Sequence, residues 1–181
     1  MDEKKRVRLS KFLSKVLRHE PESIGITLES GGWVLVTDLL SGLEKAGTRT
    51  SREELNLVVT KCEKQRFAFD ETGTKIRANQ GHSTDVDLQL EVTAPPAELF
   101  HGTAHTTVPV ILRDGLLKMA RHHVHLSADP VTATNVGQRH GKPVILVVDT
   151  AKMRADGHIF YRSTNGVWLV EHVPPQYLRV Q

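Results

Sequence analysis

Arginine and histidine side chains in the first half of this sequence have the chemistry needed to handle a phosphate group. Arg18 and His19 are adjacent, and Arg77 reads as the end of a short strand, followed by polar and glycine residues. A guanidinium presents a planar fork of donors to an anion, and an imidazole can carry a proton near neutral pH. These residue types therefore indicate phosphate binding with proton transfer beside it.

Each of these residues also has a simpler explanation. Pro21 disfavours the α conformation at Glu20, so Arg18 and His19 fall in the last turn of a helix, where the helix dipole favours cations. Arg77, considered alone, fits a solvent-exposed strand end. The residue types by themselves leave both explanations open.

The ten histidines raise the question of a metal site, and the densest cluster is His122, His123 and His125. On a strand His123 and His125 would share a face, but no further ligand at zinc spacing accompanies them in the sequence, which also lacks HExxH and CxxC motifs. GxGxxG and Walker glycine loops are also missing. The sequence predicts no bound metal, and neither a Rossmann nor a P-loop site.

A basic amphipathic helix is predicted to position Arg18 and His19. Residues 4–18 contain seven basic residues and no acidic one. Basic residues at i, i+3, i+7 and i+10 share one face, opposite an apolar face: Arg8, Lys11, Lys15 and Arg18. This basic face is either the solvated side of a docked helix or a row of cations that faces nucleic-acid phosphates.

Two more helices and a hairpin follow in the first lobe. Thr37 is expected to cap one helix, and Ser51 with Glu54 forms a capping box that opens the next. Residues 67–78 alternate around a turn and predict a hairpin. Three helices and a two-stranded wing indicate a winged-helix-like lobe over residues 1–84, a fold that often binds nucleic acid.

The remainder of the chain reads as an α+β lobe. Residues 85–97 form the predicted connector, which includes one alternating strand at 88–92, and the second lobe covers residues 98–181. Strands are expected at 99–103, 123–127, 144–148 and 166–170, with short helices at 108–114 and 130–139.

Composition limits the class of protein. The 181 residues suffice for two small lobes with cores, and the net charge of +3 comes from the first lobe, which has 15 basic and 12 acidic residues. A lone Cys62 predicts no disulfide framework and an intracellular reducing compartment. The longest apolar run, residues 144–148, is too short to span a membrane, so a cytoplasmic protein is expected.

Seven motifs in order give a more specific indication than any one of them. They lie at residues 9–19, 32–34, 76–83, 99–103, 123–127, 136–141 and 165–169. In this order they resemble the motifs of the RNA 2'-phosphotransferase family, the enzymes that finish tRNA splicing. The resemblance covers nearly the whole chain.

The resemblance implies a fold and a reaction. The fold would be α+β, with an N-terminal winged-helix-like RNA lobe and a C-terminal ADP-ribosyltransferase-type mixed-sheet lobe that binds NAD, in a monomer. Family members transfer an internal RNA 2'-phosphate to NAD without a metal. The first step gives nicotinamide and an RNA 2'-phospho-ADP-ribose intermediate, and the second gives 2'-hydroxyl RNA and ADP-ribose 1'',2''-cyclic phosphate.

By the same resemblance, residue roles can be assigned. The catalytic set would be Arg18, His19, Arg77 and Arg139. The three arginines would bind the 2'-phosphate and the charge of the transition state. His19 would either orient ribose hydroxyls or move a proton in the second step, and both roles remain open. Lys11 and Lys15 would contact the RNA substrate.

The NAD site implied by the resemblance lies in two short motifs of the second lobe. Its residues are His101, Gly102, Thr103, His125, Leu126 and Ser127. Here His101 would contact the adenosine ribose, the Gly102 backbone the nicotinamide amide, and Ser127 the nicotinamide ribose.

Two other functions use part of the same pattern. An ADP-ribosyltransferase that stops after the first step and caps terminal phosphates of nucleic acid would need nearly the same residues. A winged-helix nucleic-acid-binding protein without enzymatic activity would explain the basic helix, but would leave the motifs of the second lobe without a role.

Overall fold

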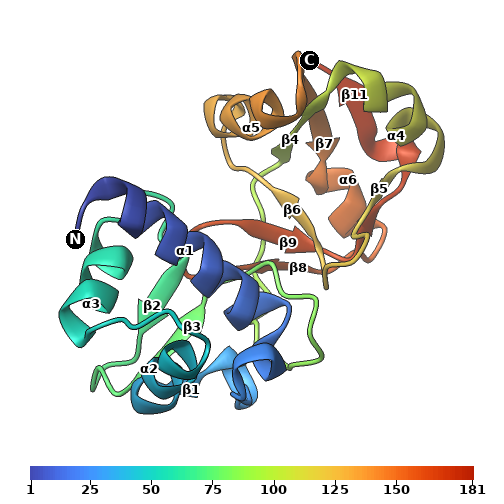
Figure 1. The fold of residues 1–181 in the computed structure, drawn as a ribbon. Coiled ribbons are helices and arrows are strands. Elements are labelled where there is room, and N and C mark those ends of the chain that lie inside the picture. The colour runs from blue at the N-terminus through green and yellow to red at the C-terminus, as the bar shows by residue number, and fades with distance from the viewer. The chain divides into compact units, whose positions relative to one another are not determined.

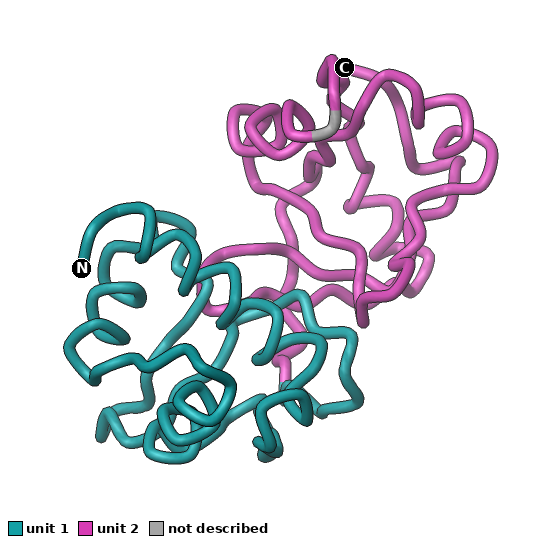
Figure 2. Tube along the Cα trace, in the orientation of Figure 1, with its two compact units in different colours: residues 1–89 teal, residues 90–181 magenta. Residues whose placement is uncertain are grey.

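The computed structural model describes residues 1–139 and 141–181. The chain divides into two compact units, Met1–Gln89 and Leu90–Gln181, drawn in teal and magenta in Figure 2. Each unit encloses its own cluster of buried apolar side chains. Within the described ranges, no helix combines the length and the apolar character that a membrane span requires.

Three helices and a small antiparallel sheet make up the first unit (Figure 1). The elements are α1 Glu3–Arg18, α2 Val36–Lys45, α3 Arg52–Thr60, the strands β1 Val34–Leu35, β2 Phe67–Phe69 and β3 Lys75–Ala78, and the 3-10 turns Pro21–Ile24 and Ser30–Gly32. The strand order is β1-β3-β2. The predicted first helix and the hairpin of β2 with β3 are confirmed.

Helix α1 separates its two faces as its sequence predicted. Leu9, Leu13, Val16 and Leu17 are buried in the core of the unit, where α1 packs against α3 and β3. Because burial of these side chains removes apolar surface from water, it fixes the rotation of the helix and leaves the basic side chains toward solvent. The position of Arg18 at the end of α1 follows from this rotation.

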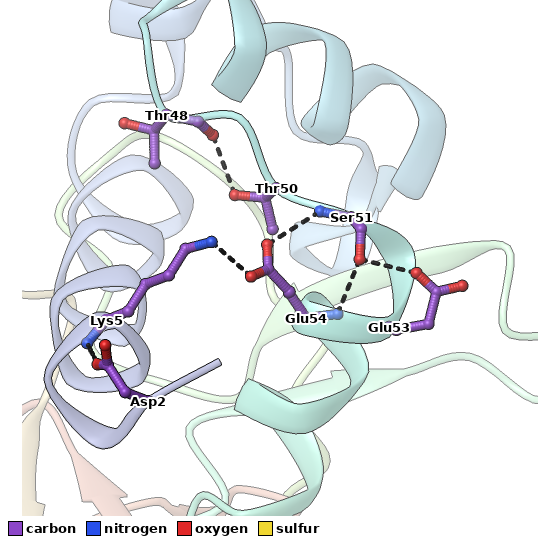
Figure 3. Close-up of polar contacts among 7 residues, drawn as sticks. All are labelled: Asp2, Lys5, Thr48, Thr50, Ser51, Glu53 and Glu54. Carbon is purple, nitrogen blue, oxygen red and sulfur yellow. Dashed lines mark hydrogen bonds and ion pairs between the residues drawn. The ribbon is translucent and has the colours of Figure 1, made fainter.

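The start of α3 confirms the predicted capping box (Figure 3). The Ser51 hydroxyl accepts a hydrogen bond from the Glu54 backbone N–H at 3.2 Å, and the Glu54 carboxylate accepts one from the Ser51 N–H at 3.3 Å. Glu54 also pairs with Lys5 Nζ at 2.5 Å, which connects α3 to α1. Figure 3 shows Lys5 pointing from α1 toward this carboxylate.

The prediction that Thr37 caps α2 is wrong. The N-cap is Leu35, which makes no side-chain cap bond, and Thr37 lies inside the helix. The Val36 N–H at the first helical position instead donates to the Thr74 carbonyl at 2.9 Å. Because the neighbouring hairpin satisfies this donor, the helix can begin directly after β1 without a capping side chain.

The strand predicted at residues 88–92 is also absent from this described segment. Gln89 has φ +52°, which interrupts an extended backbone, and its N–H donates to the Asp87 carboxylate at 2.9 Å in a local turn. The Asp87 carbonyl accepts from the Gly31 N–H at 2.7 Å. Only Val92 makes an isolated bridge, with Tyr161.

Small sheets and short helices form the second unit (Figure 1). The strands are β4 Glu98–Ala104, β5 Leu116–Leu117, β6 Val124–Leu126, β7 Pro143–Asp149, β8 Phe160–Arg162, β9 Trp168–Val170, β10 His172–Val173 and β11 Leu178–Val180. The helices are α4 Val108–Asp114, α5 Pro130–Gly137 and α6 Thr150–Ala155, and the 3-10 turns are His105–Thr107, Gln138–His140 and Pro175–Tyr177.

The strands of the second unit pair in the orders β11-β7-β4, β6-β9-β8 and β10-β5. All these pairings are antiparallel, where a mixed sheet was expected. The predicted strands at 99–103 and 144–148 are confirmed as β4 and β7. The short partners β5, β8, β10 and β11 were not predicted, because two or three residues carry too little periodicity to be recognised.

Two glycines let β4 and α5 approach each other closely. A Cβ atom at Gly102 would lie 1.7 Å from the Ala133 carbonyl oxygen, and one at Gly137 would lie 3.0 Å from the Thr103 backbone nitrogen. Both obstacles are backbone atoms, so neither can move aside as a flexible side chain would. The absence of a side chain at Gly102 therefore determines where α5 lies on this sheet.

We expect Gly102→Ala to lower the free energy of unfolding by about 2 kcal/mol, because the added methyl forces helix and strand apart. Urea denaturation measures the effect. Gly157→Ala is the control: its φ of +92° adds backbone strain, but nothing lies within 4 Å of its Cβ, so its loss should be smaller. A Gly102→Ala variant as stable as the wild type would contradict this packing.

Candidate active site

In the first unit, the loop after β3 closes against the end of α1. The backbone N–H groups of Ser83 and Thr84 donate to the Arg18 carbonyl at 2.9 and 3.2 Å, and His19 Nδ1 lies 2.8 Å from the Ser83 hydroxyl. Gly81 has φ +90°, and a Cβ there would be 3.6 Å from Arg18 Nη1. The Arg18 side chain therefore packs along the loop, and the His19 ring is oriented by it.

Arg77, in the middle of β3, is held by the segment before β1. Its guanidinium stacks on the Trp33 ring, 4.5 Å from the ring centroid, and Nη1 makes a long 3.4 Å bond to the Gly31 carbonyl. Burial lowers the pKa of Arg77, but a guanidinium keeps its charge in proteins. Its buried Nε has no hydrogen-bond partner within the described structure. The stacking fixes the plane of this cation.

A fully buried histidine anchors the loop that connects these groups. His82 is 0% exposed, and a Cβ at Gly32 would lie 3.2 Å from its Nε2 atom. His82 thus packs beside the 3-10 turn that precedes Trp33. Since α1 also packs against β3, the elements that carry Arg18, His19 and Arg77 belong to one packed part of the first unit.

In the second unit, the two motifs predicted to bind NAD lie on neighbouring strands. Phe100 and Ser127 exchange backbone hydrogen bonds of 2.9 and 2.8 Å, which joins β4 to the end of β6. His101 Nδ1 lies 3.1 Å from the His125 carbonyl oxygen. The structure therefore brings His101, His125 and Ser127 together across one strand pairing, although 24 positions separate His101 from His125.

Burial lowers the pKa of His101 below its ordinary value near 6.5, against a smaller opposite effect of the bond to the His125 carbonyl. The unfolded chain then binds more protons than the folded chain between the lowered pKa and 6.5. Stability should be complete above pH 6.5 and should fall as the pH drops below it.

We therefore expect His101→Gln, whose side chain does not titrate in this range, to lose less stability than the wild type between pH 7.5 and 5.5. Urea unfolding at the two pH values measures this. His105→Gln is the matched control, because that exposed histidine on the adjoining turn should leave the pH dependence unchanged. An equal loss of stability in His101→Gln and the wild type would contradict the assignment.

Arg139 lies in the 3-10 turn Gln138–His140 that continues α5, and both α5 and this turn pack against β4. This packing brings the turn to the strand that carries His101. Arg139 is exposed, and in the described part of the chain its guanidinium makes no hydrogen bond or ion pair. Its planar donor fork is therefore available to an anion.

The two lysines predicted to contact RNA differ in their surroundings. Lys11 is exposed and lines a groove together with Arg18. Lys15 instead pairs with Glu20, its Nζ lying 2.8 Å from the carboxylate. Among the described residues, no three His, Cys, Asp or Glu side chains gather as a group that could hold a metal ion.

The sequence of the whole chain matches that of known proteins. Residues 4–172 match the model of the RNA 2'-phosphotransferase, Tpt1 / KptA family. A probable RNA 2'-phosphotransferase of Nostoc punctiforme is 56% identical over 179 residues, 99% of both chains. One of Trichormus variabilis is 57% identical over 180 residues, again 99% of both, and one of Streptomyces coelicolor is 51% identical over 99% of this chain and 97% of its own.

The chain belongs to the RNA 2'-phosphotransferase family. The resemblance found in the sequence motifs is thereby confirmed, and membership makes the chain a transferase. Every residue predicted for the site lies within the matched range 4–172.

Sequence reasoning about this RNA 2'-phosphotransferase family member missed several residues that the structure places at the site. Trp33 stacks under Arg77, Ser83 contacts His19, and Gly31 and Gly32 adjoin Arg77 and the buried His82 respectively. Trp33 and the two glycines stand in one short run of the sequence, which was the available signal. Their contacts with Arg77 and His82 cross some 45 positions, so spacing could not reveal them.

Proposed function

We propose that this enzyme removes an internal 2'-phosphate from RNA by transferring it to NAD in two steps. Nicotinamide leaves in the first step, and ADP-ribose 1'',2''-cyclic phosphate and 2'-hydroxyl RNA are the final products. The observation that carries the proposal is the family match over residues 4–172, which includes all four predicted catalytic residues.

Cations held by the fold support the proposed phosphate chemistry. Arg18 packs along the loop at Gly81, and Arg77 is held flat on Trp33. Guanidinium groups fixed in this way can neutralise and orient a phosphate dianion without reorganising during the reaction. In this proposal Arg18, Arg77 and Arg139 bind the transferred phosphate, which carries negative charge in both steps.

His19 has the contact that a positioning or proton-transferring group needs. Its Nδ1 lies 2.8 Å from the Ser83 hydroxyl, and its ring is exposed. A hydrogen bond at one ring nitrogen selects the tautomer and directs the other nitrogen outward. We propose that Nε2 of His19 orients a ribose hydroxyl or accepts its proton in the second step.

The donor set of the second unit suits a nucleotide with ribose and amide groups. His101 carries an imidazole that burial keeps neutral near pH 7, and Ser127 and Thr103 carry hydroxyls. Neutral donors and acceptors pair with hydroxyl and amide groups, and no carboxylate among the six predicted residues repels a pyrophosphate. We propose that His101, Gly102, Thr103, His125, Leu126 and Ser127 bind NAD, which supplies the ribose carbon that the 2'-phosphate attacks.

We further propose that residues 1–84 act as a winged-helix-like RNA-binding lobe and residues 98–181 as an ADP-ribosyltransferase-type NAD-binding lobe. Three helices with the sheet order β1-β3-β2 support the first assignment. The β4–β6 pairing that carries both motifs supports the second.

The test is incubation with an oligoribonucleotide that carries one internal 2'-phosphate, with and without NAD. We expect NAD-dependent formation of 2'-hydroxyl RNA, nicotinamide and the cyclic phosphate, all separable by chromatography. An enzyme that only caps phosphates would stop at ADP-ribosylated RNA, and a binding protein would release no nicotinamide. Loss of the phosphate without NAD would refute the proposed mechanism.

A further inference from the structure

A basic groove runs along α1 in the first unit. Its volume is about 510 Å³, and its walls come from α1 and from the segment between α3 and β2. Six of its lining side chains are cationic: Arg6, Lys11, Arg18, Lys61, Lys64 and Arg66. Two acidic residues, Glu3 and Glu63, also line it. The groove therefore has a clear positive excess and contains Arg18, one of the proposed catalytic residues.

Contacts within the unit hold part of this cationic wall in place. Arg6 Nη1 donates to the Lys61 carbonyl at 3.1 Å, which joins α1 to the end of α3. The Arg66 N–H and Nη1 each lie 3.4 Å from the sulfur of buried Cys62. These contacts set the two walls of the groove against each other and direct both arginines along it.

The lysines of the groove differ from their neighbours on α1. Lys5 is paired with Glu54, and Lys15 with Glu20. Lys11 and Lys61 are exposed, and across the described chain neither ammonium makes an ion pair or hydrogen bond. Gathering unpaired like charges costs free energy, and a polyanion that binds there offsets the cost.

The length of the groove matches a short RNA strand. Because an α-helix rises about 1.5 Å per residue, Lys11 lies about 10 Å and Arg6 about 18 Å from Arg18 along the axis. At a rise of about 3.4 Å per nucleotide in a helical strand, that distance covers up to about five nucleotides. None of the described lining residues is aromatic, so recognition would use phosphates rather than base stacking.

We propose that this groove binds the sugar-phosphate backbone of the RNA on one side of the 2'-phosphate, with Lys11 and Lys61 as phosphate contacts. The inference rests on the proposed function, which puts the reacting phosphate at Arg18. It departs from the sequence prediction for Lys15, which is paired with Glu20. The groove makes substrate binding depend on RNA length and on salt, and not on base sequence.

The experiment compares two 2'-phosphorylated substrates, a dinucleotide and a decanucleotide with the phosphate at its centre. In Lys11→Ala/Lys61→Ala, the KM for the decanucleotide should rise about tenfold, and its salt dependence should fall by about two phosphate contacts. The kcat for both substrates and the KM for the dinucleotide should stay unchanged, because the dinucleotide does not reach the groove.

Lys45→Ala/Arg49→Ala is the matched control, because it removes the same charge from the same unit at residues that do not line the groove. This control and Lys15→Ala should both keep the wild-type KM. An equal KM for the decanucleotide in the groove variant and in the control would overturn the proposal. So would a KM that rises equally for both substrate lengths, because the lysines would then act at the reacting phosphate.

Direct binding separates this inference from the proposed function. Fluorescence anisotropy of a labelled decanucleotide without a 2'-phosphate needs no turnover, and the groove variant should bind it about tenfold more weakly than the control. If the wild type converts neither substrate, the proposed function fails, and this measurement alone still decides the groove. Equal binding by both variants would refute it.

Discussion

Arg139→Ala lowers kcat by on the order of a hundredfold or more if the arginine binds the transferred phosphate, as loss of a transition-state donor typically does. The exposed guanidinium stands on the turn that packs against β4. Since the side chain makes no contact in the described structure, its removal should leave the melting temperature almost unchanged.

Charge accumulates on phosphorus in the second step, so this variant should also build up RNA 2'-phospho-ADP-ribose. A gel shift of a labelled oligonucleotide detects that species. Arg154→Ala, which removes an exposed arginine of α6 in the same unit, is the control and should turn over normally. If Arg139 only complements the helix dipole, its loss costs about 1 kcal/mol or less of stability and leaves kcat intact, which would refute the assignment.

Arg77→Lys should lose nearly as much activity as Arg77→Ala, on the order of a hundredfold in kcat. The lysine keeps the positive charge but loses the planar donor fork and most of the stacking on Trp33, which fixes the orientation of the cation. Steady-state kinetics with the 2'-phosphorylated oligonucleotide measure the effect.

The first unit contains a close structural match to Arg77. The Arg52 guanidinium lies 4.6 Å from the centroid of the Phe69 ring and donates to the Gly73 carbonyl at 2.7 Å. Arg52→Lys changes the same chemical group on the same kind of support, so it should lower stability but leave kcat unchanged. Full activity in Arg77→Lys would show that charge alone suffices and would contradict the proposed bidentate role.

Local interactions account for what the sequence by itself determined. The two faces of α1, its end at Arg18 and the capping box at Ser51 all depend on residues no more than four positions apart. The hairpin of β2 and β3 depends on a short turn. The ordered motifs also identified the family, because several short patterns in sequence determine it together.

Other features required the tertiary structure, because the contacting residues are far apart in the chain. The stacking of Arg77 on Trp33, the joining of Arg6 to Lys61 and the bridge between Phe100 and Ser127 each span more than 25 positions. Long-range packing also explains why Gly102 must lack a side chain.

The outcome at Lys15 shows the limit of helical periodicity most directly. Spacing assigned Lys15 and Lys11 to one basic face, and the helix does carry both. Only the folded chain places Glu20 against Lys15, and Lys61 across the groove from the α1 wall that carries Lys11. Periodicity sets which face of a helix a charge occupies, whereas the neighbours that neutralise it or leave it available come from the fold.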